Sequence, residues 1–95
     1  MALDSIDLET MPGYELVKEG LTDLESGRPT LAALLVSIGH PRLVSLGLNV
    51  PPPLPEPEGR LYVLLREKHG DGAHSRYNAL VRRLVSFEHA VACAK

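Results

Sequence analysis

The sequence predicts an all-α protein, a compact bundle of four longer helices and one short helix. Leucine occurs 17 times against two isoleucines and eight valines, a balance that favours helices over strands. Between Tyr77 and Ala92 the apolar residues recur at intervals of three and four, which is the spacing of one face of a long amphipathic helix. A chain of 95 residues has the size of a single domain.

The N-terminal residues 1–10 have scattered apolar positions between acidic residues. We expect them to form a loosely attached arm that docks on the rest of the chain through Leu3, Ile6 and Leu8. Residues 11–95 then form the single helical domain.

The first helix is expected over residues 12–26. Thr10 can cap its start, because a threonine hydroxyl accepts a hydrogen bond from a free amide of the first turn, and Gly27 can supply a left-handed stop. Gly20 falls on the apolar face of this helix. Its missing side chain lets the backbone of another helix approach closely.

The second helix is expected at about 30–39, with Thr30 as its cap. Ser37 is its only polar residue, and a helix that is apolar on nearly every side is buried on nearly every side. We therefore place this helix at the centre of the bundle. A short third helix is expected over 41–47, because proline is favoured in a first turn.

Residues 49–57 contain five prolines, which can neither continue a helix nor pair in a central strand. This segment is expected to be a stiff crossover between distant helices. The fourth helix should then run from about 58 to 69 and stop at Gly70.

The last helix is expected at about 73–93, with Asp71 or Ser75 as its cap. Its inward face gathers apolar residues: Tyr77, Leu80, Val81, Leu84, Val85, Phe87, Val91 and Ala92. This face should pack along the second helix.

Glu88 lies near the centre of that inward face and is a candidate buried charge. An ionised carboxylate in the core needs a partner, and Arg42, Arg60 and Tyr62 are the candidates. The alternative is that this part of the helix emerges into solvent, since glutamate is rarely fully buried.

The opposite face of the last helix has small residues at intervals of seven, which permit close approach of another helix. Arginines flank them, and arginine is favoured at protein interfaces. The sequence therefore predicts an interaction surface made of Arg76, Ala79, Arg82, Arg83, Ser86, Ala90 and Cys93. A second copy in a homodimer, or a partner protein, would use it. The alternative is an exposed face on which nothing packs.

Ten basic and twelve acidic residues give a net charge of -2, so no long-range positive field draws this chain to nucleic acid or to an anionic membrane. The single Cys93 excludes an internal disulfide, and the first residues lack the pattern of a secretory signal. The longest apolar run, residues 31–36, is far shorter than a bilayer span. We expect a cytoplasmic protein without a membrane partner.

No catalytic residue, cofactor or metal site is expected. His89 and Cys93 share a helical face at a spacing that can present two zinc ligands. Two ligands do not complete a site, and His69, Asp71 and His74 are expected at the corner at the other end of the helix, more than about 15 Å away.

The second and third helices have the order of a helix-turn-helix unit. A recognition helix must present polar and basic side chains to base edges, whereas the third helix offers only Arg42 and Ser45. DNA recognition by this unit is therefore disfavoured.

Arg83 is followed six positions later by His89, a spacing that resembles the motif of small helical ribonucleases in the HEPN superfamily. The resemblance is confined to these two residues, and Leu84 stands where that family places a polar residue. It implies a ribonuclease-like site, which a partner chain would have to complete.

Our leading hypothesis is a non-enzymatic protein–protein interaction or homodimerisation module. The alternative is nucleic-acid binding through the basic side of the last helix, with Arg76, Arg82, Arg83 and His89 as the contacting residues. A third hypothesis is that the chain is one part of a toxin–antitoxin or other two-gene system.

Overall fold

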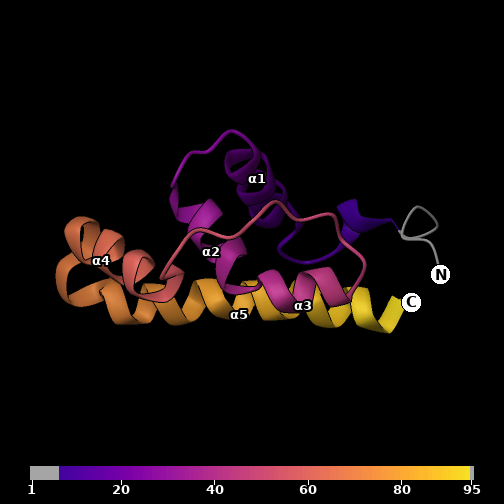
Figure 1. Cartoon of the computed structure of the whole chain (residues 1–95). Helices are drawn as coiled ribbons and strands as arrows, with labels where there is room; N and C mark the ends of the chain where they lie inside the picture. Colours follow the sequence, from indigo (N-terminus) through magenta and orange to yellow (C-terminus); the bar gives the residue numbers. More distant parts are fainter. Residues whose placement is uncertain (1–6, 95) are drawn as a thin grey trace.

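The computed structural model describes residues 7–94 and confirms the all-α class, because this part of the chain contains no strand. Figure 1 shows its five α-helices, which are accompanied by two 3-10 turns. In chain order the elements are η2 (Leu8–Thr10), α1 (Tyr14–Glu25), α2 (Leu31–Ile38), α3 (His40–Ser45), α4 (Pro57–His69), η3 (Gly70–Gly72) and α5 (Ala73–Ala94). None of the helices formed by these residues is long and apolar enough to cross a membrane.

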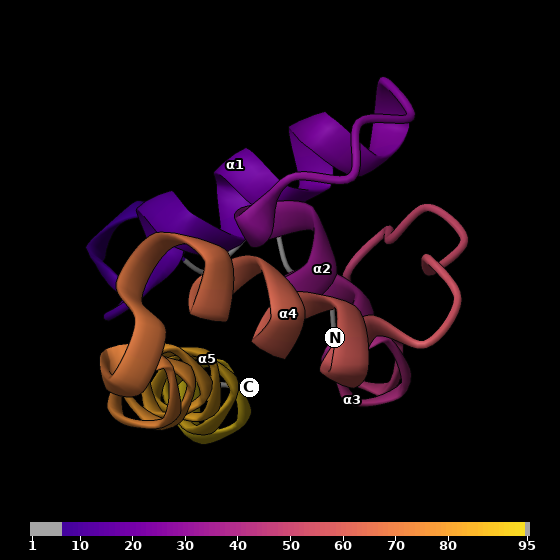
Figure 2. The same ribbon diagram turned by 90° about the vertical axis from the view of Figure 1, so that its left-hand side faces the viewer.

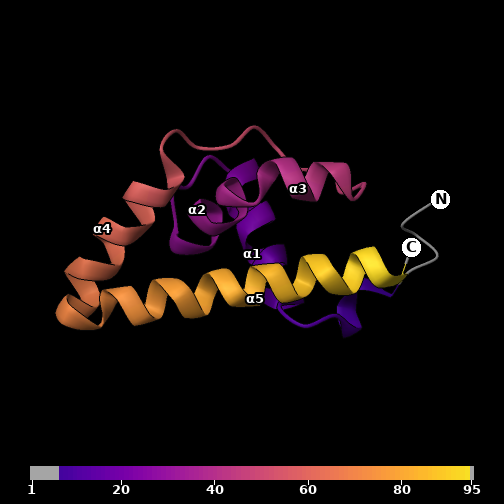
Figure 3. The ribbon, with the colours of Figure 1, turned by 90° about the horizontal axis from the view of Figure 1, so that it is seen from below.

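Helix α5 is the longest element and sets the long dimension of a molecule that measures 42 × 25 × 18 Å. Its 22 residues span about 33 Å. Figures 1 and 3 show α4 joining α5 at one end. Seen along the axis of α5, helices α1 to α4 gather on one side of it (Figure 2). The other side of α5 is left without a covering element from the described chain.

Helix α2 is the centre of the fold, as its apolar sequence predicts. It contacts each of the other four α-helices. Its residues from Ala32 to Ser37 are all buried, and they meet the inward residues Leu84, Phe87 and Val91 of α5 in one core. Val85 was predicted to face inward, but it is 39% exposed, because it lies at the edge of the apolar arc of α5.

The start of α1 differs from the sequence prediction. Thr10 does not cap this helix; its hydroxyl donates instead to the Asp7 carbonyl, 2.8 Å away, within the η2 turn. The residue before α1 is Gly13, whose positive φ of 77° turns the chain into the helix. Leu8 packs against the core, whereas Leu3 and Ile6 lie outside the described residues.

Helices α1 and α2 cross at Gly20, as predicted for a glycine on the apolar face of α1. A Cβ at this position would lie 2.9 Å from the carbonyl carbon of Ala32. It would lie closer still to the carbonyl oxygen of Ala32 and to a methyl group of Val36. The contact between these two helices therefore depends on the absence of a side chain at Gly20.

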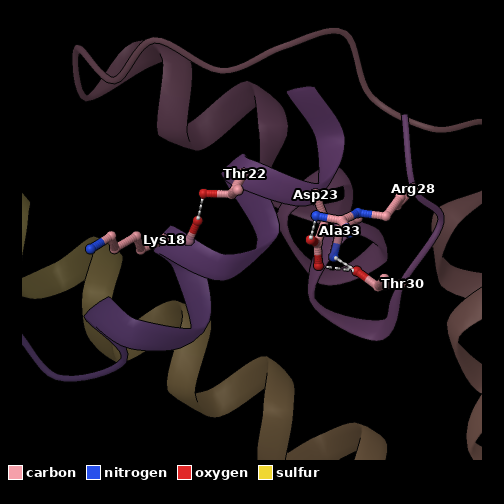
Figure 4. Close-up of polar contacts among 6 residues, drawn as sticks. All are labelled: Lys18, Thr22, Asp23, Arg28, Thr30 and Ala33. Carbon is pink, nitrogen blue, oxygen red and sulfur yellow. Dashed lines mark hydrogen bonds and ion pairs between the residues drawn. The ribbon is translucent and has the colours of Figure 1, made fainter. Parts of the chain in front are cut away.

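The corner between α1 and α2 is held by polar contacts, shown in Figure 4. The Ala33 amide donates to Thr30 Oγ1 at 3.2 Å, so Thr30 caps α2 as predicted. The Thr30 hydroxyl donates in turn to Asp23 Oδ2 at 2.6 Å. Asp23 also pairs with the Arg28 guanidinium, 3.3 Å away. The last turn of α1 and the first turn of α2 thereby share one buried carboxylate.

The proline-rich crossover is tied to the middle of α2. The Ser37 hydroxyl donates to the Ala33 carbonyl at 2.8 Å and accepts from the Leu54 amide at 3.0 Å. The only polar residue of α2 therefore fixes a segment 17 residues further along the chain.

The α4–α5 corner differs from the prediction in its cap. Gly70, with a φ of 56°, ends α4 as expected. The chain then continues through η3 directly into α5. Asp71 lies in η3 and Ser75 lies inside α5, and neither side chain forms a hydrogen bond within the described residues.

Candidate functional site

The most distinctive surface of the molecule is the side of α5 that faces away from the bundle. We call it the outer face of α5 and define it by Arg76, Ala79, Arg82, Arg83, Ser86, Ala90 and Cys93. All of these residues are exposed except Ala90, which is half-buried. The helix is continuous beneath them from Ala73 to Ala94. The outer face is therefore presented on one straight element that the core holds from behind.

The outer face has a small-residue centre and arginine edges. At about 100° per residue, Ala79, Ser86 and Cys93 fall along one line of the helix surface. Arg82 falls on one side of this line, and Arg76 and Arg83 fall on the other side. The side chains at the centre are short enough for the backbone of a second helix to approach.

All exposed charges on α5 are positive. The helix contains three arginines and a single carboxylate, Glu88, which is buried. Among residues 7–94, Arg76, Arg82 and Arg83 form no hydrogen bond or ion pair through their side chains. These three guanidinium groups are therefore unpaired within the described chain.

Arg83 is also in contact with its own chain. Its carbonyl oxygen lies 2.7 Å from the position that a Cβ on Gly13 would take. Arg83 also lines a small cleft of about 180 Å³, together with Glu9 and Glu15. Arg83 thus stands at the border between the outer face and the start of α1, whereas Arg76 and Arg82 do not line this cleft.

Glu88 is only 8% exposed and lies beneath the corner between α2 and α3. A Cβ on Gly39 would lie 3.0 Å from Glu88 Oε2. Burial raises the pKa of the Glu88 carboxyl, and the charges of Arg42 and His89 oppose this only in part.

None of the three predicted partners forms a hydrogen bond or ion pair with Glu88. Arg42 acts on the carboxylate only through its charge. Arg60 donates to the Pro55 carbonyl at 3.3 Å. Tyr62 packs against Tyr77, with ring centroids 6.0 Å apart. Within the described chain, Glu88 forms no hydrogen bond or ion pair through its side chain, and its carboxylate oxygens keep some contact with solvent.

The residues considered for metal binding or catalysis do not converge. No group of three histidine, cysteine, aspartate or glutamate side chains that could hold a metal ion occurs among residues 7–94. His89 and Cys93 are exposed on α5, one turn apart, whereas His69 is the last residue of α4, near the opposite end of α5. Arg83 and His89 are on one unbroken helix, about 120° apart around its axis.

A groove along α4 was missed by the sequence analysis. It has a volume of about 510 Å³ and lies between α4 and the corner that joins α1 to α2. Val63 is 57% exposed in it, and Gly59, one turn earlier, has no atom near the position of a Cβ. The spacing of Gly59 and Val63, four residues apart on one face of α4, was the sequence pattern that could have indicated one wall of this groove. The other wall, formed by Pro29 and Leu34, could not be predicted from that spacing.

No family model matches this chain, and no match is found among the curated proteins or the solved structures.

Proposed function

We propose that this chain is a non-enzymatic protein–protein interaction module whose partner packs along the outer face of α5. One observation carries the proposal: a helix of 22 residues is buried on one side and uncovered along the other. Small side chains at the centre of the uncovered side allow an interhelical distance of about 8–10 Å. Arginines at its edges can pair with carboxylates of the partner.

A second copy of the chain and a different protein both fit this surface sterically. A second copy would pack about a two-fold axis, so that the outer face of one copy contacts the outer face of the other. Light scattering from micromolar to millimolar concentration measures this directly. A monomer over the whole range removes the second copy as the occupant.

Substitutions at the small residues test the surface itself. Ala79→Arg and Ala90→Glu place a large charged side chain in the path of an approaching helix. Either should abolish binding of the partner. Ala79→Arg should do so while leaving the helical content unchanged, because Ala79 is exposed. Val63→Arg is the matched control for Ala79→Arg, since it introduces the same charged side chain at an exposed position of α4. Association that survives Ala79→Arg but is lost in Val63→Arg would move the interface to α4 and refute the proposal.

The alternative is nucleic-acid binding by the same basic residues, Arg76, Arg82 and Arg83, with His89 beside them. The exposed positive charge of α5 supports this alternative. Phosphate contacts weaken steeply with salt, so an electrophoretic assay at low and high salt separates the two functions. Absence of binding at low salt would end the nucleic-acid hypothesis.

A further inference from the structure

The charges of this molecule are unevenly distributed. The exposed charged groups of α5 are Arg76, Arg82 and Arg83, and its single carboxylate is turned into the core. The rest of the described chain, residues 7–72, holds ten acidic and six basic residues. The outer face of α5 is therefore a cationic surface on an acidic molecule.

A second copy is a poor electrostatic complement to this surface. A two-fold axis on the outer face would bring two sets of arginines together and supply no carboxylate from either helix. Glu9 and Glu15 border the face beside Arg83, but neither lies with Arg76 or Arg82 in that cleft. Cations at an interface lose hydration and need opposite charges in compensation, and like charges brought together oppose association. Helix α5 offers no such compensation to its own copy.

We infer that the occupant of the outer face is an acidic helix from a different protein. This inference rests on the proposed function and specifies the partner. A helix seated over Ala79, Ser86 and Cys93 lies between Arg82 on one side and Arg76 on the other. Carboxylates on both flanks of that helix then reach guanidinium groups that have no partner in the described chain.

The same geometry favours a helix over a nucleic acid. A strip of short side chains, Ala79, Ser86 and Cys93, separates the arginines. These side chains cannot reach a phosphate backbone, but they allow the close approach of another helix. The net charge of -2 also repels a polyanion at a distance, and a short acidic helix carries far fewer charges. No aromatic side chain stands among the residues of the outer face to stack on bases.

The single cysteine provides a direct test of where a partner binds, because Cys93 is exposed on the outer face. The probe is a synthetic helical peptide of about 20 residues, the length that covers α5, with glutamates spaced by seven on both edges of an alanine face. The rate of Cys93 alkylation by iodoacetamide is measured against peptide concentration. At ten times the dissociation constant, the rate should fall about tenfold.

Three controls make the result specific. A peptide with lysine in place of every glutamate should leave Cys93 unprotected. Cys93→Ser combined with Val63→Cys moves the only thiol to α4, where the acidic peptide should not protect it. Arg76→Glu with Arg82→Glu should weaken binding about tenfold, because favourable pairs become repulsive ones. Lys18→Glu with Arg66→Glu changes the net charge equally and should leave binding unchanged.

Each contrary outcome has a definite meaning. If Cys93 alkylation slows as the protein concentration rises without peptide, a second copy occupies the face: the proposed function stands and this inference fails. Protection by a DNA or RNA duplex that exceeds protection by the peptide also overturns the inference, in favour of the nucleic-acid alternative. If neither peptide nor protein concentration affects Cys93, the inference and the proposed function both fail.

Discussion

Replacing Gly20 with alanine should destabilise this chain, although the same change in an isolated helix is stabilising. In a helix interior, alanine is favoured over glycine by about 1 kcal/mol. At Gly20, however, the new Cβ would lie 2.9 Å from the carbonyl carbon of Ala32, with the carbonyl oxygen and a methyl group of Val36 nearer still. A backbone carbonyl cannot rotate away as a flexible side chain can. Relief requires α1 to move off α2.

The two effects can be compared in magnitude. Overpacking costs about 1–3 kcal/mol, and the upper end applies here because the obstacle is main chain. After the gain in helix propensity, the net loss should be about 2 kcal/mol. For a domain of this size, that loss lowers the melting temperature by roughly 10 °C.

Gly59→Ala is the matched control, because Gly59 lies in α4 and no atom lies within 4 Å of its Cβ position. This variant should gain about 0.5–1 kcal/mol from the reduced entropy of the unfolded chain. Urea and thermal unfolding followed by circular dichroism measure both variants. If Gly20→Ala proves as stabilising as Gly59→Ala, the close crossing of α1 and α2 is refuted, and with it the central position of α2.

Three further predictions concern single polar groups. Glu88→Gln should remove one pH-dependent contribution to stability. Because burial raises the pKa of the Glu88 carboxyl, the contribution of this group is greatest when it is protonated and is lost as the pH rises through the raised pKa. The difference between wild type and variant should follow that course, and a constant difference would contradict it. Thr30→Ala should lower the free energy of unfolding in urea by about 1–2 kcal/mol, because it removes the cap of α2. Thr30→Ser keeps a hydroxyl at this position and should retain most of the stability. Ser37→Ala should cost about 1–3 kcal/mol and accelerate hydrogen exchange at the Leu54 amide, which loses its acceptor; unchanged exchange would show that the crossover is held elsewhere.

The helices and their order could be predicted because local chemistry fixes their ends. Thr30 caps α2 and Gly70 ends α4, as the sequence predicts. The start of α1 was predicted wrongly for a reason that is also local. Thr10 finds an acceptor three residues earlier, in the η2 turn, and Gly13 then redirects the chain with a positive φ. Two competing uses of one hydroxyl cannot be ranked from spacing alone.

The candidate site was predictable only where it belongs to one helix. Periodicity places Arg76, Ala79 and Cys93 together, because residues on one face of a helix share a surface whatever surrounds it. The surroundings of Glu88 could not be predicted in this way. They depend on the approach of Gly39, which is 49 positions away in the sequence. The groove along α4 has the same origin, since its second wall comes from the α1–α2 corner.

The fold and the proposed interaction use different sides of the same helix, which makes the two separable by mutation. Leu84, Phe87 and Val91 hold α5 in the core, whereas Arg76 and Arg82 form no polar contact within the described chain. Charge reversal at these two arginines should therefore leave the melting temperature nearly unchanged, since surface substitutions of this kind alter stability by about 0.5 kcal/mol or less. A large loss of stability would mean that the arginines serve the fold, and their cationic surface would no longer argue for a partner.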